Sequence, residues 1–226
     1  MRPSVRPPSR PVQLHHGGSF RRRLARAFGR DEAAGDQLWR RIVHGSGALV
    51  LAYFLVPVGF FVLVPKVVVL LAALGAAGLL EVARLGFGAE LPTIRGYEAR
   101  RPASYVFYAV ALVVAVLVFP EPIAVAVVLG TAFVDPLAGE LRSTGSSRGL
   151  RLGVPFVVYT ALATFALGAV GRWPWVDAAV LGALAGVVGV SVERWRFRWL
   201  DDDLTMTIVP ALVLYGVGVL ALGLPR

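Results

Sequence analysis

The sequence predicts an all-α integral membrane protein with about seven transmembrane helices, the N-terminus in the cytoplasm and the C-terminus outside. Apolar residues make up 57% of the 226 residues, whereas a soluble domain has roughly 45–50%. The mean hydropathy is +0.70. The apolar residues form long runs separated by short polar segments, which is typical of helices that cross a bilayer several times.

The first 44 residues predict a basic and largely disordered cytoplasmic arm. They are rich in proline, arginine and glycine, a composition that cannot bury a core. Within the arm, residues 19–29 place Phe20, Leu24 and Phe28 four residues apart, with arginines between them. This spacing predicts a short amphipathic helix on an anionic lipid surface. A disordered basic tail is the alternative.

Residues 45–226 form one polytopic domain in which each apolar segment is close to the ~20 residues that a membrane-spanning helix needs. The third and fourth segments are somewhat short. The expected segments are residues 45–64, 67–85, 103–119, 122–138, 153–171, 175–192 and 205–223.

The distribution of charge predicts the orientation. Of the 23 Lys and Arg residues, only Lys66, Arg172 and Arg226 fall on one side of the predicted membrane, so the other side is cytoplasmic. Most Asp and Glu residues also lie on that side, so chemistry with charged ligands belongs to the cytoplasmic face. We expect a bacterial-type inner membrane. The net charge of +9 follows from this orientation and does not indicate nucleic acid binding.

Three consecutive carboxylates, Asp201 to Asp203, directly precede the last apolar segment. Like charges at a membrane boundary are unfavourable unless they are hydrated, paired or bound to a metal. The cluster is therefore either the solvated start of a helix or a set of ligands for a divalent cation.

Asp135 ends an apolar stretch that begins at Ile123. Twelve helical residues span about 18 Å, less than the ~30 Å hydrocarbon core, so we expect Asp135 below the membrane surface. Pro136 should end regular hydrogen bonding nearby, and Gly139 should allow close backbone approach. These features favour a metal or phosphate site, and an aspartate paired with an arginine at a helix end is the alternative.

The following residues, 139–153, alternate glycines, hydroxyl side chains and arginines. Such a segment is either a phosphate cradle or an ordinary flexible loop. Glu81 and Arg84 are three residues apart, as are Glu98 and Arg101, which places each pair on one helix face and favours structural ion pairs. His44 at the start of the first segment is more typical of a hydrogen-bonded anchor than of an acid or base.

In their order along the chain, these features resemble the polyprenol kinase family, which includes CTP-dependent dolichol and diacylglycerol kinases and phytol and farnesol kinases. Five stretches carry the resemblance: Arg40-Arg41-Ile42-Val43-His44-Gly45-Ser46-Gly47, Leu80-Glu81-Val82-Ala83-Arg84, Tyr97-Glu98-Ala99-Arg100-Arg101, Val134-Asp135-Pro136-Leu137-Ala138-Gly139 and Asp201-Asp202-Asp203-Leu204-Thr205-Met206-Thr207. They extend over nearly all of the membrane domain.

The resemblance implies transfer of a phosphoryl group from CTP or another nucleoside triphosphate to the hydroxyl of a membrane lipid alcohol, with Mg²⁺. It implies Asp135, Asp202 and Asp203 as metal ligands, with Asp202 foremost, and Asp135, Asp202 and His44 as catalytic residues. The residues expected to bind nucleotide phosphates are Arg41, Arg84, Arg101, Arg142, Arg148 and Ser146. The residues expected to support the site are Glu81, Glu98, Gly139 and Glu140.

The sequence also departs from the family pattern. Ser146-Ser147-Arg148-Gly149 stands where the family has an element with a lysine and an acidic residue, and Val134, Asp203 and Thr207 replace the usual glycine, asparagine and proline. A catalytically inactive scaffold or lipid-binding homologue therefore stays open, as does a cytidylyltransferase-like enzyme acting on a lipid phosphate. Glycines at 182 and 186 permit close helix packing, within one chain or in a homo-oligomer.

Overall fold

The computed structural model describes residues 41–57, 65–87, 101–194 and 201–225, and all the regular secondary structure in these ranges is helical. The all-α prediction is confirmed for them. The predicted arm up to residue 40, with its interfacial helix at 19–29, lies outside the described residues, and so does Glu98.

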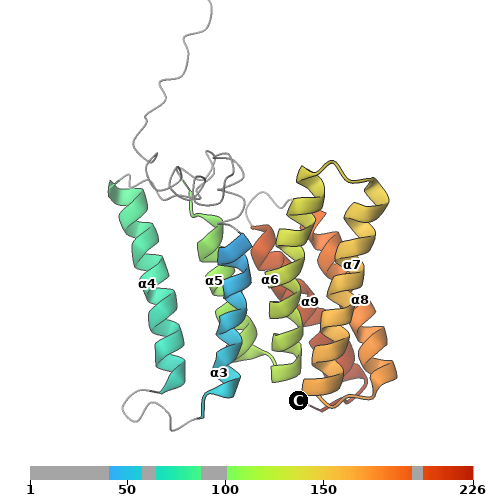
Figure 1. Cartoon of the computed structure of the whole chain (residues 1–226). Coiled ribbons are helices and arrows are strands. Elements are labelled where there is room, and N and C mark those ends of the chain that lie inside the picture. Colours follow the sequence, from blue (N-terminus) through green and yellow to red (C-terminus); the bar gives the residue numbers. More distant parts are fainter. Residues whose placement is uncertain (1–40, 58–64, 88–100, 195–200, 226) are drawn as a thin grey trace, which may run out of the picture.

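Each of the seven predicted apolar segments contains a helix, and successive helices run in opposite directions (Figure 1). The bounds are Arg41–Leu55, which includes η1 (Gly47–Leu51) and α3 (Ala52–Leu55); α4 (Lys66–Phe87); α5 (Ser104–Val118); α6 (Glu121–Ser143); α7 (Arg148–Phe165), continued by η3 (Ala166–Val170); α8 (Trp175–Arg194); and α9 (Asp202–Leu214), continued by η4 (Tyr215–Ala221). Within the described ranges, five of these helices are long and apolar enough to cross a membrane, and Arg41–Leu55 and α5 are shorter.

Two helix ends that lie near prolines differ from the prediction. The first helix ends at Leu55, and Val56 is extended (ψ 120°) because the residue before a proline, here Pro57, avoids the helical conformation. By contrast, α6 continues through Pro136 to Ser143. A proline removes one hydrogen bond from a helix, and neighbouring packed helices can compensate for that loss.

The predicted loop at residues 139–153 is also corrected. Most of it is helical, because α6 ends only at Ser143 and α7 begins at Arg148. The connection is a short turn in which Gly145 has a positive φ of 67°. The Ser147 hydroxyl accepts a hydrogen bond from the Leu150 N–H (3.4 Å) and caps α7, as serine commonly does at this position.

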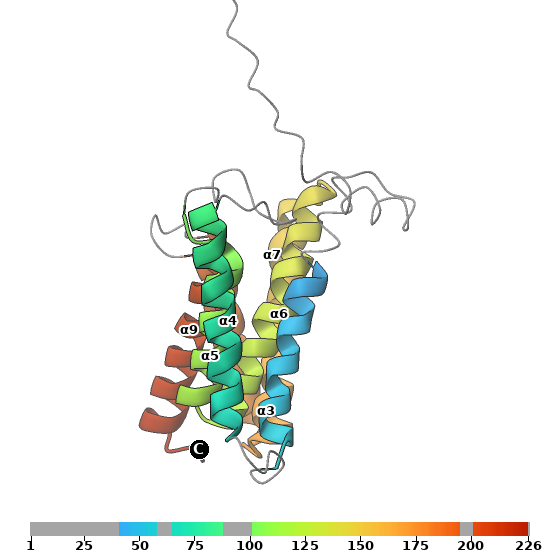
Figure 2. The same cartoon turned by 90° about the vertical axis from the view of Figure 1, so that its left-hand side faces the viewer.

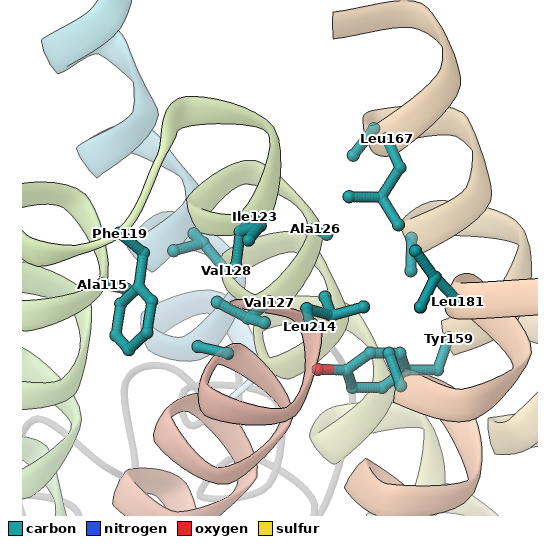
Figure 3. Close-up of a cluster of buried hydrophobic side chains, with 14 of the residues drawn as sticks. Ala115, Phe119, Ile123, Ala126, Val127, Val128, Tyr159, Leu167, Leu181 and Leu214 are labelled. Atoms are coloured by element: carbon teal, nitrogen blue, oxygen red, sulfur yellow. The ribbon is translucent and has the colours of Figure 1, made fainter. Parts of the chain in front are cut away.

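Helices α5 to α9 surround one apolar core (Figure 3). Its largest fully buried side chains include Ile123, Tyr159, Leu167 and Leu181. The Tyr159 ring occupies space that a Cβ atom at Gly130 or Gly189 would fill. These glycines let α7 approach α6 and α8 closely, as small residues do between membrane helices.

Helix α4 lies at the edge of the bundle beside α5 (Figures 1 and 2). Its only two buried residues are the charged Glu81 and Arg84, whereas Leu79, Val82 and other apolar side chains are exposed. A helix in water would show the opposite pattern. This exposure is compatible with apolar surroundings such as lipid.

Candidate functional site

Three titratable side chains from distant parts of the sequence converge near the starts of the first helix and of α9. The His44 Nε2 atom lies 3.1 Å from Asp203 Oδ1 and 3.5 Å from Asp135 Oδ2. His44 comes from the first helix, Asp135 from α6 and Asp203 from the first turn of α9. His44 and Asp203 are buried and Asp135 is half-buried. We call these three residues the His–Asp–Asp centre.

Tyr108 of α5 fixes the position of His44. The two rings are stacked with their centroids 4.9 Å apart, and the Tyr108 hydroxyl donates a hydrogen bond to the His44 carbonyl (2.8 Å). A Cβ atom at Gly47 would collide with the Tyr108 hydroxyl, so this contact requires a residue without a side chain. Sequence analysis missed Tyr108, because an aromatic residue in an apolar run gives no functional signal. Gly47, one turn after His44, was the sequence feature that could have indicated a close contact at this point.

Two buried threonines bring the carboxylates of α6 and α9 level with each other. The Thr131 and Thr207 hydroxyls are 2.9 Å apart. The Thr207 hydroxyl donates to the Asp203 carbonyl (2.9 Å), so Thr131 must donate to Thr207. Thr131 lies one turn before Asp135, and Thr207 lies one turn after Asp203, so the pair sets the register between the two helices. The sequence marked Thr207 only as a departure from a family pattern.

Asp203, not Asp202, is the member of the aspartate cluster that lies beside Asp135. The prediction named both as metal ligands and put Asp202 first. Consecutive side chains at the start of α9 point about 100° apart, and Asp203 is the one grouped with His44 and Asp135. Asp202 groups with Asp201 and Asp203 instead, and its catalytic role stays a prediction.

Asp201 caps α9, since its carboxylate accepts a hydrogen bond from the Asp203 N–H (3.2 Å). Burial, and then the negative charges of Asp203 and Asp202, raise the pKa of Asp201 to about 8. Burial and repulsion from these two carboxylates therefore favour the protonated form of Asp201 near neutral pH.

Glu81 and Arg84 form a buried cluster between α4 and the start of α5. The Arg84 guanidinium donates to both Glu81 oxygens (2.8 and 2.6 Å) and to the Arg101 carbonyl (2.8 Å). Glu81 also accepts from the Ala103 N–H and the Tyr105 hydroxyl (2.8 Å each). These contacts favour the structural ion pair that the spacing suggested over a phosphate-binding Arg84. The exposed Arg101 side chain stays a predicted phosphate ligand.

Two further arginines expected to bind phosphates take part in ion pairs that connect helices. Arg41 of the first helix pairs with Glu140 of α6, and Arg142 of α6 pairs with Glu193 of α8. The side chains of Arg142 and Glu140 remain 50% and 41% exposed, so both pairs are accessible from the end of the bundle that carries the His–Asp–Asp centre.

The turn between α6 and α7 holds the remaining candidates. The Ser146 hydroxyl lies 3.0 Å from the Thr144 hydroxyl, and Arg148 is exposed at the start of α7. At Gly139, the nearest atom to an added Cβ would be Arg142 Nη2 at 3.9 Å. This is an ordinary contact, so the expected close backbone approach at Gly139 is not present.

The His–Asp–Asp centre has the donor set of a divalent cation site. Carboxylate oxygens are ligands for hard cations such as Mg²⁺, and an imidazole is the commonest nitrogen ligand for metals in proteins. Comparison of the chain with protein-family models, curated proteins and solved structures finds no match. The chemistry of the site is therefore argued from its own residues.

Proposed function

We propose that the protein is a lipid-alcohol kinase that transfers the terminal phosphoryl group of CTP or another nucleoside triphosphate to the hydroxyl of a membrane lipid alcohol. Polyprenols, phytol-like alcohols and diacylglycerol are the substrate classes. The observation that carries this proposal is the convergence of His44, Asp135 and Asp203 at one end of a set of long apolar helices. The sequence resemblance to polyprenol kinases supports it.

The reaction suits such a site because phosphoryl transfer depends mainly on positioning and on stabilisation of negative charge. The alcohol oxygen forms a bond to the γ-phosphorus as the bond to the β-phosphate oxygen breaks, and the hydroxyl proton passes to a base. Asp202 is our candidate base, since it is half-buried at the start of α9. A carboxylate serves in this role in protein kinases.

Asp135 and Asp203 would hold the divalent cation, which would neutralise charge on the phosphate oxygens. Arg148, in the first turn of α7, and Arg101, just before α5, have exposed side chains and would contact the phosphates. Arg41 and Arg142 would do so by exchanging their carboxylate partners for phosphate oxygens. The lipid tail would stay among the helices while its hydroxyl enters from the side.

The same proposal includes a topology of seven membrane spans with the N-terminus and the His–Asp–Asp centre on the cytoplasmic side of a bacterial-type inner membrane. The arginine distribution supports this orientation. The alternating directions of the helices also support it.

A catalytically inactive lipid-binding protein is the second candidate function. The observation that favours it is that Arg41, Arg84 and Arg142 each pair with a glutamate in the described structure. These guanidiniums would have to leave a carboxylate to bind a phosphate. Under this function, nucleotide would not bind at all.

The test is transfer of label from γ-³²P-CTP or γ-³²P-ATP to a prenol or diacylglycerol by the full-length protein in lipid nanodiscs with Mg²⁺. We expect transfer by the wild type and a loss of about 100-fold or more in Asp135→Asn and Asp203→Asn. Asp177→Asn, which changes a carboxylate at the start of α8, at the opposite end of the bundle, is the matched control and should keep full activity. Parallel reactions with α-³²P-CTP would reveal cytidylyl transfer.

Full activity in Asp135→Asn would show that the site is wrongly assigned. Absence of transfer from every nucleotide tested, together with no thermal stabilisation by nucleotide and Mg²⁺, would favour the inactive lipid-binding protein.

A further inference from the structure

The His–Asp–Asp centre combines two carboxylates with one imidazole in a largely buried position. His44 is 6% exposed and Asp203 is 3% exposed. A protonated imidazole would balance only one of two carboxylate charges, whereas a divalent cation balances both and leaves the imidazole neutral. Buried charges in an apolar surrounding are costly unless they are paired or bound to a metal, so the composition of the centre favours an ion.

The imidazole restricts which ion suits the centre. Mg²⁺ strongly prefers oxygen ligands in octahedral geometry and keeps several waters. Imidazole nitrogen instead suits first-row transition metals such as Zn²⁺ and Fe²⁺, while carboxylates also accept Mn²⁺. A site with one nitrogen and two carboxylate donors therefore favours a transition-metal dication over Mg²⁺.

The surroundings of His44 hold its ring in place for such a role. Tyr108 stacks on the ring and binds the His44 backbone carbonyl, while Nε2 faces both carboxylates. Groups that fix the orientation of a ligating histidine contribute strongly to metal affinity. Because Tyr108 holds the ring, His44 Nε2 faces both carboxylates before any ion binds.

We propose that the centre of His44, Asp135 and Asp203 is a resident site for a first-row transition-metal dication, which it holds before any nucleotide binds. This proposal goes beyond the proposed kinase function and does not depend on it, since it concerns metal binding in the absence of nucleotide and lipid alcohol.

The test uses the full-length chain with His15→Gln and His16→Gln, because the sequence has three histidines and His44 is then the only one left. Mn²⁺ is titrated into the detergent-solubilised protein, and the six-line electron paramagnetic resonance signal of free Mn²⁺ is measured. We expect one Mn²⁺ to be bound per chain and to remain bound in a 100-fold excess of Mg²⁺.

His44→Gln, made in the same background, replaces the nitrogen ligand with an amide oxygen. We expect this variant to bind Mn²⁺ at least about tenfold more weakly and to lose its selectivity over Mg²⁺. Asp203→Asn should also weaken Mn²⁺ binding, whereas Asp177→Asn should not. An unchanged Mn²⁺-to-Mg²⁺ preference in a folded His44→Gln protein would overturn the proposal.

A second measurement does not depend on whether any His44 variant folds. Pulsed electron paramagnetic resonance detects the nitrogen of an imidazole bound directly to Mn²⁺. In the His15→Gln, His16→Gln protein that signal can come only from His44, and its absence from a protein that binds Mn²⁺ would overturn the proposal. The kinase proposal fails on a different observation, the absence of label transfer.

Discussion

Replacing Glu81 with glutamine should reveal how strongly α4 is attached to the bundle. In the wild type, Glu81 accepts four hydrogen bonds, two from Arg84, one from the Ala103 N–H and one from the Tyr105 hydroxyl. The amide keeps the shape of the side chain but removes its charge, and it has only one acceptor oxygen. Arg84, which is 4% exposed, would be left as an uncompensated buried cation.

Breaking a buried ion pair by removing one partner costs about 3–5 kcal/mol. The bond from Arg84 to the Arg101 carbonyl remains in the variant, so we expect Glu81→Gln to lower the free energy of unfolding by about 3 kcal/mol, the lower end of that range. The measurement is equilibrium unfolding in mixed micelles, followed by tryptophan fluorescence.

The double variant Glu81→Gln, Arg84→Met removes both charges and should recover at least about 1 kcal/mol relative to the sum of the single changes. Glu121→Gln changes an exposed carboxylate of α6 and should shift stability by less than about 1 kcal/mol. Wild-type stability in Glu81→Gln, or strictly additive effects in the double variant, would refute the argument that this cluster holds α4.

Two further predictions concern the core around Tyr159. Gly130→Ala should destabilise the protein by about 1–3 kcal/mol, because the new Cβ atom would overlap the Tyr159 ring. Its control in the same unfolding assay is Gly149→Ala, where the added Cβ meets nothing within 4 Å. Equal stabilities of the two variants would contradict the packing described. Tyr159→Phe should raise the free energy of unfolding by about 1 kcal/mol, because the fully buried Tyr159 hydroxyl has no hydrogen-bond partner among the described residues. A large loss of stability in this variant would mean that the hydroxyl does have a hydrogen-bond partner.

The helical fold follows directly from the apolar runs, because a run of about 20 apolar residues has few alternatives to a helix in an apolar medium. The helix ends were harder to predict. Pro57 and Pro136 look alike in sequence, yet a helix ends just before Pro57, whereas α6 continues through Pro136. The tertiary environment of the two prolines differs, since Pro136 belongs to a helix that packs against α7 and α9.

The candidate site could be predicted in part. His44 and Asp135 were each noticeable as ionisable groups at the edge of an apolar segment. The choice between Asp202 and Asp203 depended on the rotational phase of α9, and one residue of uncertainty at a helix start changes that phase by about 100°. Tyr108 and Thr131 could not be found, because their roles depend on partners 64 and 76 residues away.

The buried ion pair of Glu81 and Arg84 on α4 also has a consequence for folding during synthesis. Synthesis proceeds from the N-terminus, so Glu81 and Arg84 leave the ribosome before Ala103 and Tyr105, which complete their hydrogen bonds. During that interval Glu81 and Arg84, one helix turn apart, can neutralise each other. The arrival of α5 then adds the bonds from Ala103 and Tyr105 and converts a self-neutralised helix into a docked one.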